Sequence, residues 1–303
     1  METRPLGDGG PDVPVICLGA WPFSGRMGSY PEEQAIRTVH ACLDAGITFI
    51  DTAEAYGTSE AVVGKALRGH RQEVFLATKL SGQHSSQHIA EAIENSLRAL
   101  GTDYVDLYQI HSPRPGRPIG QTMADLLKLR DDGKVRYIGV SNFSAQQQIE
   151  AAQYGPVTSS QPQYNMLFRD AEEEILPICQ ENGTGVIVHS PLARGLLTAK
   201  YRPGHRFSAD DKRSEYAVFK PSRFEAAHPY VEKLSAWAAA RGRDIVQLAI
   251  AWTLAHPAVT SSIVGAKSPE QALHNAGAAE WTLTKPELAE LDLILAGARF
   301  DSS

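Results

Sequence analysis

Strand-like and helix-like segments alternate along almost the whole chain, and this alternation restricts the fold more than any other feature. Apolar runs predict eight strands, and a helix is expected in each interval between them. The predicted strands cover residues 15–19, 47–51, 73–79, 104–111, 135–141, 158–163, 185–190 and 259–265. The predicted helices cover residues 31–46, 59–68, 85–101, 120–132, 144–153, 170–182, 229–241, 244–256, 269–279 and 284–297.

The strand-like runs are apolar on both faces, as in a parallel sheet covered by helices. Eight such units in roughly 250 residues favour an α/β fold of the (β/α)8 TIM-barrel type, with residues 1–303 as a single domain. A long polar loop, residues 194–227, is expected after the seventh strand, and an extra helix at the C-terminal end. Because no GxGxxG follows the first strand, a Rossmann dinucleotide fold is disfavoured.

Composition narrows the class of protein. The net charge of −6 and the pI near 5.9 argue against nucleic acid or an anionic membrane surface as the main partner. No apolar run has the length of a signal peptide core or a membrane span. Cys17, Cys42 and Cys179 lie far apart within apolar patterns, which indicates buried, reduced thiols. We therefore expect a cytoplasmic protein.

Polar residues stand at the ends of three consecutive predicted strands, where the active site of a (β/α)8 barrel is built. Asp51 ends the second strand, and Tyr56 lies in the loop that follows. Lys79 closes the third strand, and His111 closes the fourth. Each residue alone has an ordinary explanation as a helix cap, a solvated lysine or a packed ring. Because all four converge on one rim, the pattern predicts an active site.

These side chains suit protonation of a carbonyl oxygen while another group attacks the carbonyl carbon. A tyrosine phenol titrates near ~10, which is too high for ready proton transfer at neutral pH. An ammonium group such as that of Lys79 lowers the pKa of a neighbouring phenol, and a carboxylate such as that of Asp51 keeps the ammonium charged and oriented. A histidine beside the tyrosine polarises the carbonyl or relays a proton.

The attacking group that fits this chemistry is hydride, which requires a bound cofactor, and the loops after strands five to eight offer a place for one. Side chains of "GVSNF" (139–143) and Gln161 suit a carboxamide, and Gly195 in "HSPLARGLLTAKY" (189–201) lets backbone amides approach a pyrophosphate. In "IVGAKSPEQALHN" (263–275) the N-terminus of a helix, with Lys267 and Ser268, suits a phosphate, although the same residues also suit an ordinary Ser-Pro helix start. The candidate cofactor-binding residues are Ser141, Asn142, Gln161, His189, Ser190, Leu192, Arg194, Gly195, Lys200, Gly265, Lys267, Gln271 and Asn275.

Several long motifs, in the same order, resemble those of the aldo-keto reductases over essentially the whole chain. The matching stretches are "GITFIDTAEAYGTSEAVVGKAL", "FLATK", "DYVDLYQIH", "GKVRYIGVSNF", "QPQYN", "HSPLARGLLTAKY" and "IVGAKSPEQ". The resemblance implies a (β/α)8 barrel that reduces aldehydes and ketones with extended NAD(P)H. It implies Tyr56 as proton donor, tuned by Asp51 and Lys79. It also implies that His111 orients the carbonyl, and that Trp21 in "GAWPF" lines the substrate pocket beside Tyr56 and His111.

Two departures from the family pattern bear on the cofactor. His189 stands where many relatives carry an aromatic ring under the nicotinamide, and its smaller ring predicts weaker cofactor binding. The site for the 2′-phosphate often has a Lys-Ser pair and an Arg; here the chain has Gly265 and Ala266, with Lys267 displaced and Gln271 in place of the Arg. Other branches also have Gly and Gln there, so NADP(H) is preferred and NAD(H) is not excluded.

Two other classes compete with an active reductase. Related barrels serve as regulatory subunits of ion channels that sense redox state through bound nicotinamide. A metal-dependent hydrolase built on Asp51 and His111 is disfavoured, because nothing resembles HExxH and because His84 and His88 open an amphipathic helix with an expected solvated face. No metal is therefore expected. The substrate is expected to be a small carbonyl or alcohol, while its identity, the direction of the reaction and the oligomeric state stay open.

Overall fold

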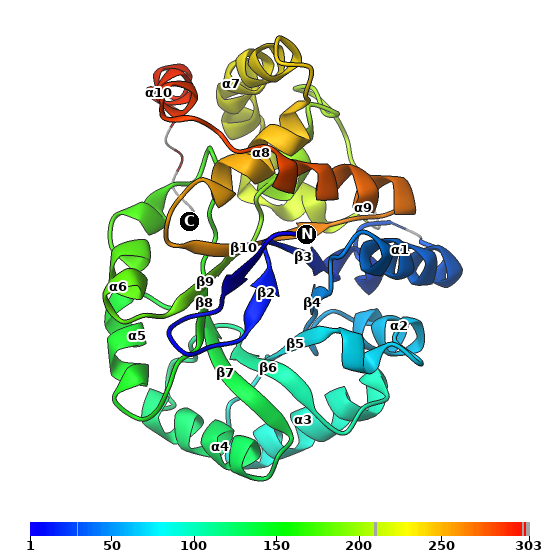
Figure 1. The fold of residues 1–303 in the computed structure, drawn as a ribbon, viewed down its shortest axis with the longest axis vertical. Coiled ribbons are helices and arrows are strands. Elements are labelled where there is room, and N and C mark those ends of the chain that lie inside the picture. The colour runs from blue at the N-terminus through cyan, green and yellow to red at the C-terminus, as the bar shows by residue number, and fades with distance from the viewer. Residues whose placement is uncertain (29, 209–210, 299, 301–303) are drawn as a thin grey trace.

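A computed structural model of the chain describes residues 1–28, 30–208, 211–298 and 300. Eight parallel strands form a closed barrel in which the last strand pairs with the first (Figure 1). All eight predicted strands are confirmed in their predicted order, and the fold is a (β/α)8 TIM barrel. In barrel order the strands are β3 (Ile16–Gly19), β4 (Phe49–Asp51), β5 (Phe75–Leu80), β6 (Val105–Ile110), β7 (Val135–Ser141), β8 (Ser159–Gln161), β9 (Gly185–Val188) and β10 (Val259–Gly265).

Helices surround the barrel on the outside (Figure 1). α3 illustrates how the sequence specifies them: its apolar residues recur at helical spacing on the buried face, Ser85 caps its N-terminus, and Gly101 ends it with a φ of 67°. The helices are α1 (Glu32–Asp44), α2 (Ser59–Ala66), α3 (Ser86–Leu100), α4 (Ile119–Asp131), α5 (Ala145–Ala152), α6 (Ile175–Glu181), α7 (Pro221–Ala239), α8 (Ile245–Leu254), α9 (Pro269–Ala276) and α10 (Lys285–Ile294).

Two helix predictions had wrong bounds. The helix predicted at 170–182 is a 3-10 turn, η3 (Asp170–Glu172), followed by the shorter α6, because Glu174 between them has φ −134°. The helix predicted to begin at 229 begins at Pro221 and continues through Pro229. An internal proline removes one backbone hydrogen bond but does not always end a helix. The expected loop 194–227 is therefore shorter, and it contains the 3-10 turns η4 (Ala193–Thr198), η5 (Lys212–Glu215) and η6 (Ala217–Phe219).

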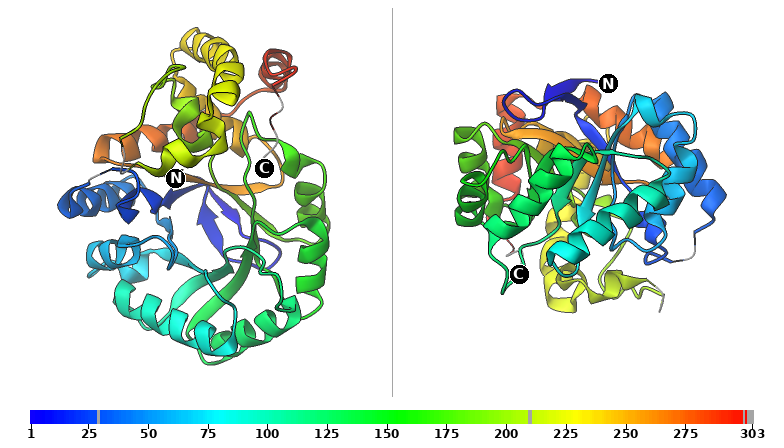
Figure 2. Two further views of the ribbon diagram at one scale, coloured as in Figure 1. Left: turned by 180° about the vertical axis from the view of Figure 1, so that it is seen from behind. Right: turned by 90° about the horizontal axis from the view of Figure 1, so that it is seen from below.

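An N-terminal hairpin of β1 (Thr3–Pro5) and β2 (Asp12–Pro14), which sequence reasoning missed, lies across one end of the barrel (Figure 1). Leu6 and Val13 are fully buried and pack with inward-facing residues of the barrel strands. The hairpin therefore closes the amino-terminal end of the barrel. Figure 2 shows it at the opposite end from the segment that follows β9.

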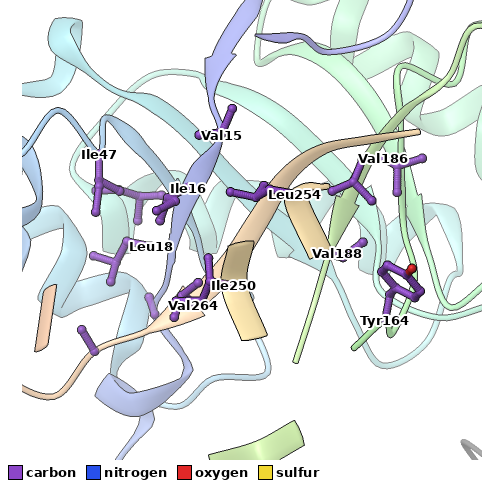
Figure 3. Packing of buried hydrophobic residues seen from close by; sticks show 14 of the residues in the cluster. Val15, Ile16, Leu18, Ile47, Tyr164, Val186, Val188, Ile250, Leu254 and Val264 are labelled. Carbon is purple, nitrogen blue, oxygen red and sulfur yellow. The ribbon is translucent and has the colours of Figure 1, made fainter. Parts of the chain in front are cut away.

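The main core lies between the strands and the ring of helices. Figure 3 shows part of this layer, with Ile250 of α8 beside Val264 of β10. A second, smaller cluster fills the inside of the barrel. α7 and α10 pack on each other outside the ring (Figure 1). Within the described residues, every helix is too short or too polar to span a bilayer.

Candidate active site

The two-residue period of the strands explains how charged residues come to face the inside of the barrel. Phe49, Ala77 and Leu107 point inward and belong to the interior apolar cluster. Because side chains alternate along a strand, Asp51 and Lys79, two residues further along β4 and β5, also point inward. The interior thus changes from apolar near the hairpin to polar at the carboxyl ends of the strands.

Lys79 and Asp51 form a buried ion pair at this end of the barrel. The lysine side chain is 0% exposed and the aspartate side chain 3%. The ammonium group donates to Asp51 Oδ2 and, over 2.8 Å, to the carbonyl oxygen of Thr52. Asp51 Oδ1 accepts hydrogen bonds from Gln109 over 2.9 Å and from Gln161 over 3.1 Å. The Lys79 ammonium group and both carboxylate oxygens of Asp51 therefore have hydrogen-bond partners, as a buried ion pair requires.

Tyr56 lies directly above this pair. The Lys79 Nζ atom is 4.9 Å from the centroid of the Tyr56 ring. Burial by itself lowers the pKa of Lys79, but the neighbouring Asp51 and Tyr56 outweigh it, so that the pKa is raised and the ammonium stays charged. Burial raises the pKa of Tyr56, and Lys79 acts in the opposite direction without outweighing burial, so the lowered pKa expected from the sequence is not found.

His111 follows β6 and completes the predicted group. Its ring lies edge-on to Tyr56, with 5.5 Å between ring centroids and 75° between planes. Burial, aided by the positive charges of Lys79, Arg114 and Arg194, lowers the pKa of His111 to about 3. The imidazole is therefore neutral near pH 7, so it can donate or accept a hydrogen bond at each nitrogen but carries no charge.

A cavity of about 510 Å³ opens above Tyr56 and His111, a volume typical of small-molecule sites. Most of the residues predicted from sequence to take part in the site line it, whereas Lys79 and Asn275 are not among the lining residues. The predicted residues in its wall are Trp21, Asp51, Tyr56, His111, Ser141, Asn142, Gln161, His189, Ser190, Leu192, Arg194, Gly195, Lys200, Gly265, Lys267 and Gln271.

Trp21 opens a 3-10 turn, η1 (Trp21–Ser24), at the rim beside Tyr56. The two ring centroids are 4.8 Å apart, and the planes meet at 77°. The guanidinium carbon of Arg26 is 5.8 Å from the centroid of the Trp21 ring, and Arg26 also lines the cavity. A ligand that reaches Tyr56 at this rim therefore meets an aromatic wall.

The predicted carboxamide site lies at the ends of β7, β8 and β9. Asn142 has the unusual φ of 57°, and its amide nitrogen donates to the carbonyl oxygen of His111 over 2.9 Å. Its amide oxygen lies 3.1 Å from His189 Nε2. Burial, aided by nearby positive charges, keeps the pKa of His189 well below its usual range, so its ring is neutral. The amide nitrogen of Gln161 is occupied by Asp51 and Gln109.

Backbone strain is concentrated around the same cavity. The described non-glycine residues with positive φ lie in the loops after β7 and β9, namely Asn142, Ser190, Ala193, Arg194 and Ala199. Such conformations are unfavourable by about 1–2 kcal/mol per residue and tend to occur at functional sites. Gly195, with a φ of 107°, occupies a conformation that glycine alone adopts readily.

α9 begins beside the cavity after β10. Ser268 caps the helix by accepting from the backbone N–H of Gln271, whose side-chain oxygen accepts from the backbone N–H of Lys267 over 2.9 Å. The ammonium group of Lys267 donates to the carbonyl oxygen of Met27. Asn275 is buried beneath this turn, and its amide nitrogen lies 3.4 Å from the carbonyl oxygen of Gly265.

Arg213 belongs to the polar segment 194–227 that was expected as a loop, but its side chain is only 12% exposed. It pairs with Asp211, lies against the rings of Tyr201 and Phe207, and lines the cavity. A pattern of polar residues does not reveal this position, because a guanidinium stacks on aromatic rings and buries its stem.

Sequence reasoning missed four polar residues near the group formed by Asp51, Tyr56, Lys79 and His111. Gln109 and Thr52 bind the buried ion pair, and neither stands out in its strand or loop. Ser81 contacts His111, and Glu54 contacts Ser81. The spacing of Gln109, two residues before His111 on the inward face of β6, is the only signal that would have found one of them.

The two histidines expected on a solvated helix face differ from that expectation. His84 is 5% exposed, and burial, with Arg114 and Arg117 nearby, lowers its pKa to about 4. His88 is 3.0 Å from the carbonyl oxygen of Ser81. In the part of the chain that the structure describes, no three His, Cys, Asp or Glu side chains are grouped as metal ligands.

Comparison with known proteins agrees with this geometry. The model of the Aldo/keto reductase family matches residues 15–296. The chain is 38% identical over 310 residues to the aldo-keto reductase YhdN of Bacillus subtilis (strain 168). The matched region covers 97% of this chain and 94% of that protein.

Solved structures agree as well. The glycerol dehydrogenase AKR11B4 of Gluconobacter oxydans superposes with a TM-score of 0.87 at 33% identity, covering 99% of this chain and 98% of that one. The thermostable aldo-keto reductase Tm1743, in complex with the inhibitor epalrestat, superposes with a TM-score of 0.81 at 32% identity, covering 97% and 100%. The chain belongs to the aldo/keto reductase family, whose members are oxidoreductases that use nicotinamide cofactors.

Proposed function

We propose that this protein reduces aldehydes or ketones with NADPH, or oxidises the corresponding alcohols, with Tyr56 as the general acid. The observation that carries the proposal is the position of the Tyr56 ring. It lies in the cavity between the buried ammonium of Lys79 and the neutral ring of His111. A proton donor with a cation beneath it and a hydrogen-bonding ring beside it suits a carbonyl oxygen that gains negative charge.

Each residue of this group has a distinct task in the proposed reaction. A nicotinamide cofactor, held in the cavity, would supply the hydride that the carbonyl carbon gains. Tyr56 gives its proton to the oxygen, and Lys79 stabilises the phenolate that remains. Asp51, held by two glutamine amides, keeps Lys79 charged and in place. His111 orients the oxygen without adding charge, because its pKa is lowered to about 3.

The charges of the cavity wall fit a cofactor with several phosphates. Among the described residues, five cationic side chains line it, whereas the one lining carboxylate among them, that of Asp51, forms an ion pair with Lys79. The cationic residues are Arg26, Arg194, Lys200, Arg213 and Lys267. NADPH has one phosphate monoester more than NADH, and this group adds a charge of about −1.5 to −2 at pH 7. This balance supports NADPH as the preferred cofactor.

Other members of the pocket suit the remaining parts of the cofactor. The backbone around Gly195 would hold the pyrophosphate, and the N-terminus of α9 with Lys267 would hold a phosphate of the nucleotide. Ser141 and Asn142 would bind the carboxamide beside the ring of His189. The absence of the family's Arg at Gln271 leaves NADH as a weaker second cofactor.

The likeness to a glycerol dehydrogenase supports small alcohols as one substrate class, in the oxidative direction. The wall formed by Trp21 and Tyr56 supports aromatic or apolar carbonyl compounds in the reductive direction. We also propose a cytoplasmic location, because all three cysteines are buried free thiols, as is usual in a reducing compartment.

The test is a fluorescence titration with NADPH and NADH, followed by NADPH oxidation with 4-nitrobenzaldehyde and NADP+ reduction with glycerol. Tighter binding of NADPH together with turnover supports the proposal. Tight binding without turnover on any carbonyl or alcohol favours a redox-sensing regulatory protein instead. Failure to bind either nucleotide contradicts both.

A further inference from the structure

The hydroxyl group of Ser81 contacts one of the two ring nitrogens of His111. Ser81 follows β5, is 9% exposed, and its Oγ atom is 2.8 Å from His111 Nδ1. Among the described residues, this is the only hydrogen-bond partner of the Ser81 hydroxyl. The other ring nitrogen, Nε2, has no hydrogen-bond partner in the described protein and is left for a ligand in the cavity that His111 lines.

The neutral state of His111 makes this contact informative. Burial and the nearby charges of Lys79, Arg114 and Arg194 keep the ring neutral, so only one of its nitrogens carries a hydrogen. If Nδ1–H donated to Ser81, Nε2 would present a lone pair to the lone pairs of a carbonyl oxygen, which is repulsive. If Ser81 donates to Nδ1, Nε2 carries the hydrogen and can bind that oxygen. The second arrangement also uses the hydroxyl hydrogen, which otherwise stays unpaired.

The backbone of Ser81 is held on both sides, which fixes its hydroxyl group. Its N–H donates to the carboxylate of Glu54, a residue of the same loop that carries Tyr56. Its carbonyl oxygen lies 3.0 Å from His88 Nε2. Because a carbonyl oxygen only accepts, His88 Nε2 is the donor in this contact. His88 Nε2 is in turn 3.5 Å from a Glu54 oxygen, so the three residues form one connected unit.

We propose that Ser81 is a positioning residue that holds His111 in the tautomer with hydrogen on Nε2, so that His111 donates a hydrogen bond to the substrate oxygen. Glu54 and His88 keep Ser81 in place. The inference rests on the proposed reductase function, because it concerns how His111 meets a carbonyl. The expected tautomer of His111 in the cofactor-free protein does not depend on whether the protein turns over a substrate.

The first experiment compares Ser81→Ala with Ser81→Thr, which keeps a hydroxyl group at the same carbon. We expect Ser81→Ala to lower both kcat and kcat/KM for the carbonyl about 10-fold, as loss of one oriented hydrogen bond predicts, with NADPH affinity unchanged. Ser81→Thr should recover most of the rate. Ser261→Ala is the matched control, since Ser261 is a fully buried serine inside the barrel whose hydroxyl has no partner among the described residues.

The second experiment reads the tautomer directly. Long-range ¹H–¹⁵N spectra of the cofactor-free wild-type protein distinguish protonated from unprotonated ring nitrogens, and His111→Gln identifies the His111 signals. We expect hydrogen on Nε2 in the wild type and in Ser81→Thr, and a mixture of the two tautomers in Ser81→Ala. The wild-type measurement does not depend on the Ser81→Ala protein, so the test remains decisive even if Ser81→Ala does not fold.

The outcomes separate this inference from the proposed function. Hydrogen on Nδ1 in the wild type, or an unchanged rate and tautomer in Ser81→Ala, overturns the role of Ser81. A slower Ser81→Ala enzyme with an unchanged tautomer also overturns it, because Ser81 would then act on the site in another way. If the wild-type protein turns over no carbonyl or alcohol, the proposed function fails, while the spectra still decide the tautomer.

Discussion

Replacing Lys79 by methionine tests the buried ion pair that supports the site. Methionine retains the apolar stem of the lysine and removes the ammonium group. Asp51 would then keep its negative charge at 2% exposure, with only the amide groups of Gln109 and Gln161 as side-chain donors. The carbonyl oxygen of Thr52 would also lose its hydrogen bond from the lysine. We therefore expect a less stable protein as well as an inactive one.

The size of the effect follows from burial. Removing one member of a fully buried ion pair lowers the free energy of unfolding by about 3–5 kcal/mol, mainly because the other charge is left unpaired. The double variant Asp51→Asn/Lys79→Met carries neither charge, so we expect it to lie within about 1–2 kcal/mol of the wild type. Turnover should fall by about 10²–10⁴-fold in both variants, because both lose the cation beneath Tyr56.

The assay is urea unfolding of the cofactor-free proteins, followed by circular dichroism, alongside NADPH oxidation. Lys128→Met is the control: this lysine is 73% exposed and pairs with Asp132 on the surface, so its loss should leave the free energy of unfolding nearly unchanged. If the double variant is no more stable than Lys79→Met, an unpaired carboxylate is not the origin of the instability, and the reasoning is refuted.

Three further predictions follow from the site. Tyr56→Phe should lower turnover by about 10²–10⁴-fold while NADPH affinity, measured by fluorescence, changes little; weaker binding with full turnover would contradict the assignment. Lys267→Met should weaken NADPH binding more than NADH binding, whereas Lys212→Met, at a lysine that is 51% exposed and outside the cavity wall, should leave both unchanged. Equal losses for both cofactors would argue against a phosphate contact. Finally, His111 and His84 have pKa values lowered to about 3 and about 4, below the ordinary 6.5. The two imidazoles therefore bind protons more readily in the unfolded chain than in the folded protein. Their contribution to the free energy of unfolding is fully present above about pH 6.5 and declines as the pH falls. Urea unfolding between about pH 7 and pH 5 should show this decline, and His84→Gln should reduce it.

The sequence alone determined the fold class and the position of the site, for a physical reason that is local. A strand buried on both faces and a helix buried on one face have different periods, so the eight units could be recognised one by one. Once parallel strands close into a barrel, their carboxyl ends must meet. Asp51, Lys79 and His111 could therefore be brought together without knowledge of any contact between them.

Tertiary structure alone decided the features that depend on partners distant in sequence. Gln109 binds Asp51 across β5, and no pattern within β6 indicates this contact. The hairpin of β1 and β2 owes its place to Leu6 and Val13, which fill the open end of a barrel built by later residues. Likewise, the hydroxyl of Ser81 meets His111 because β5 and β6 are neighbours in register. Such contacts depend on register and side-chain direction between elements, which a linear pattern of residue types does not contain.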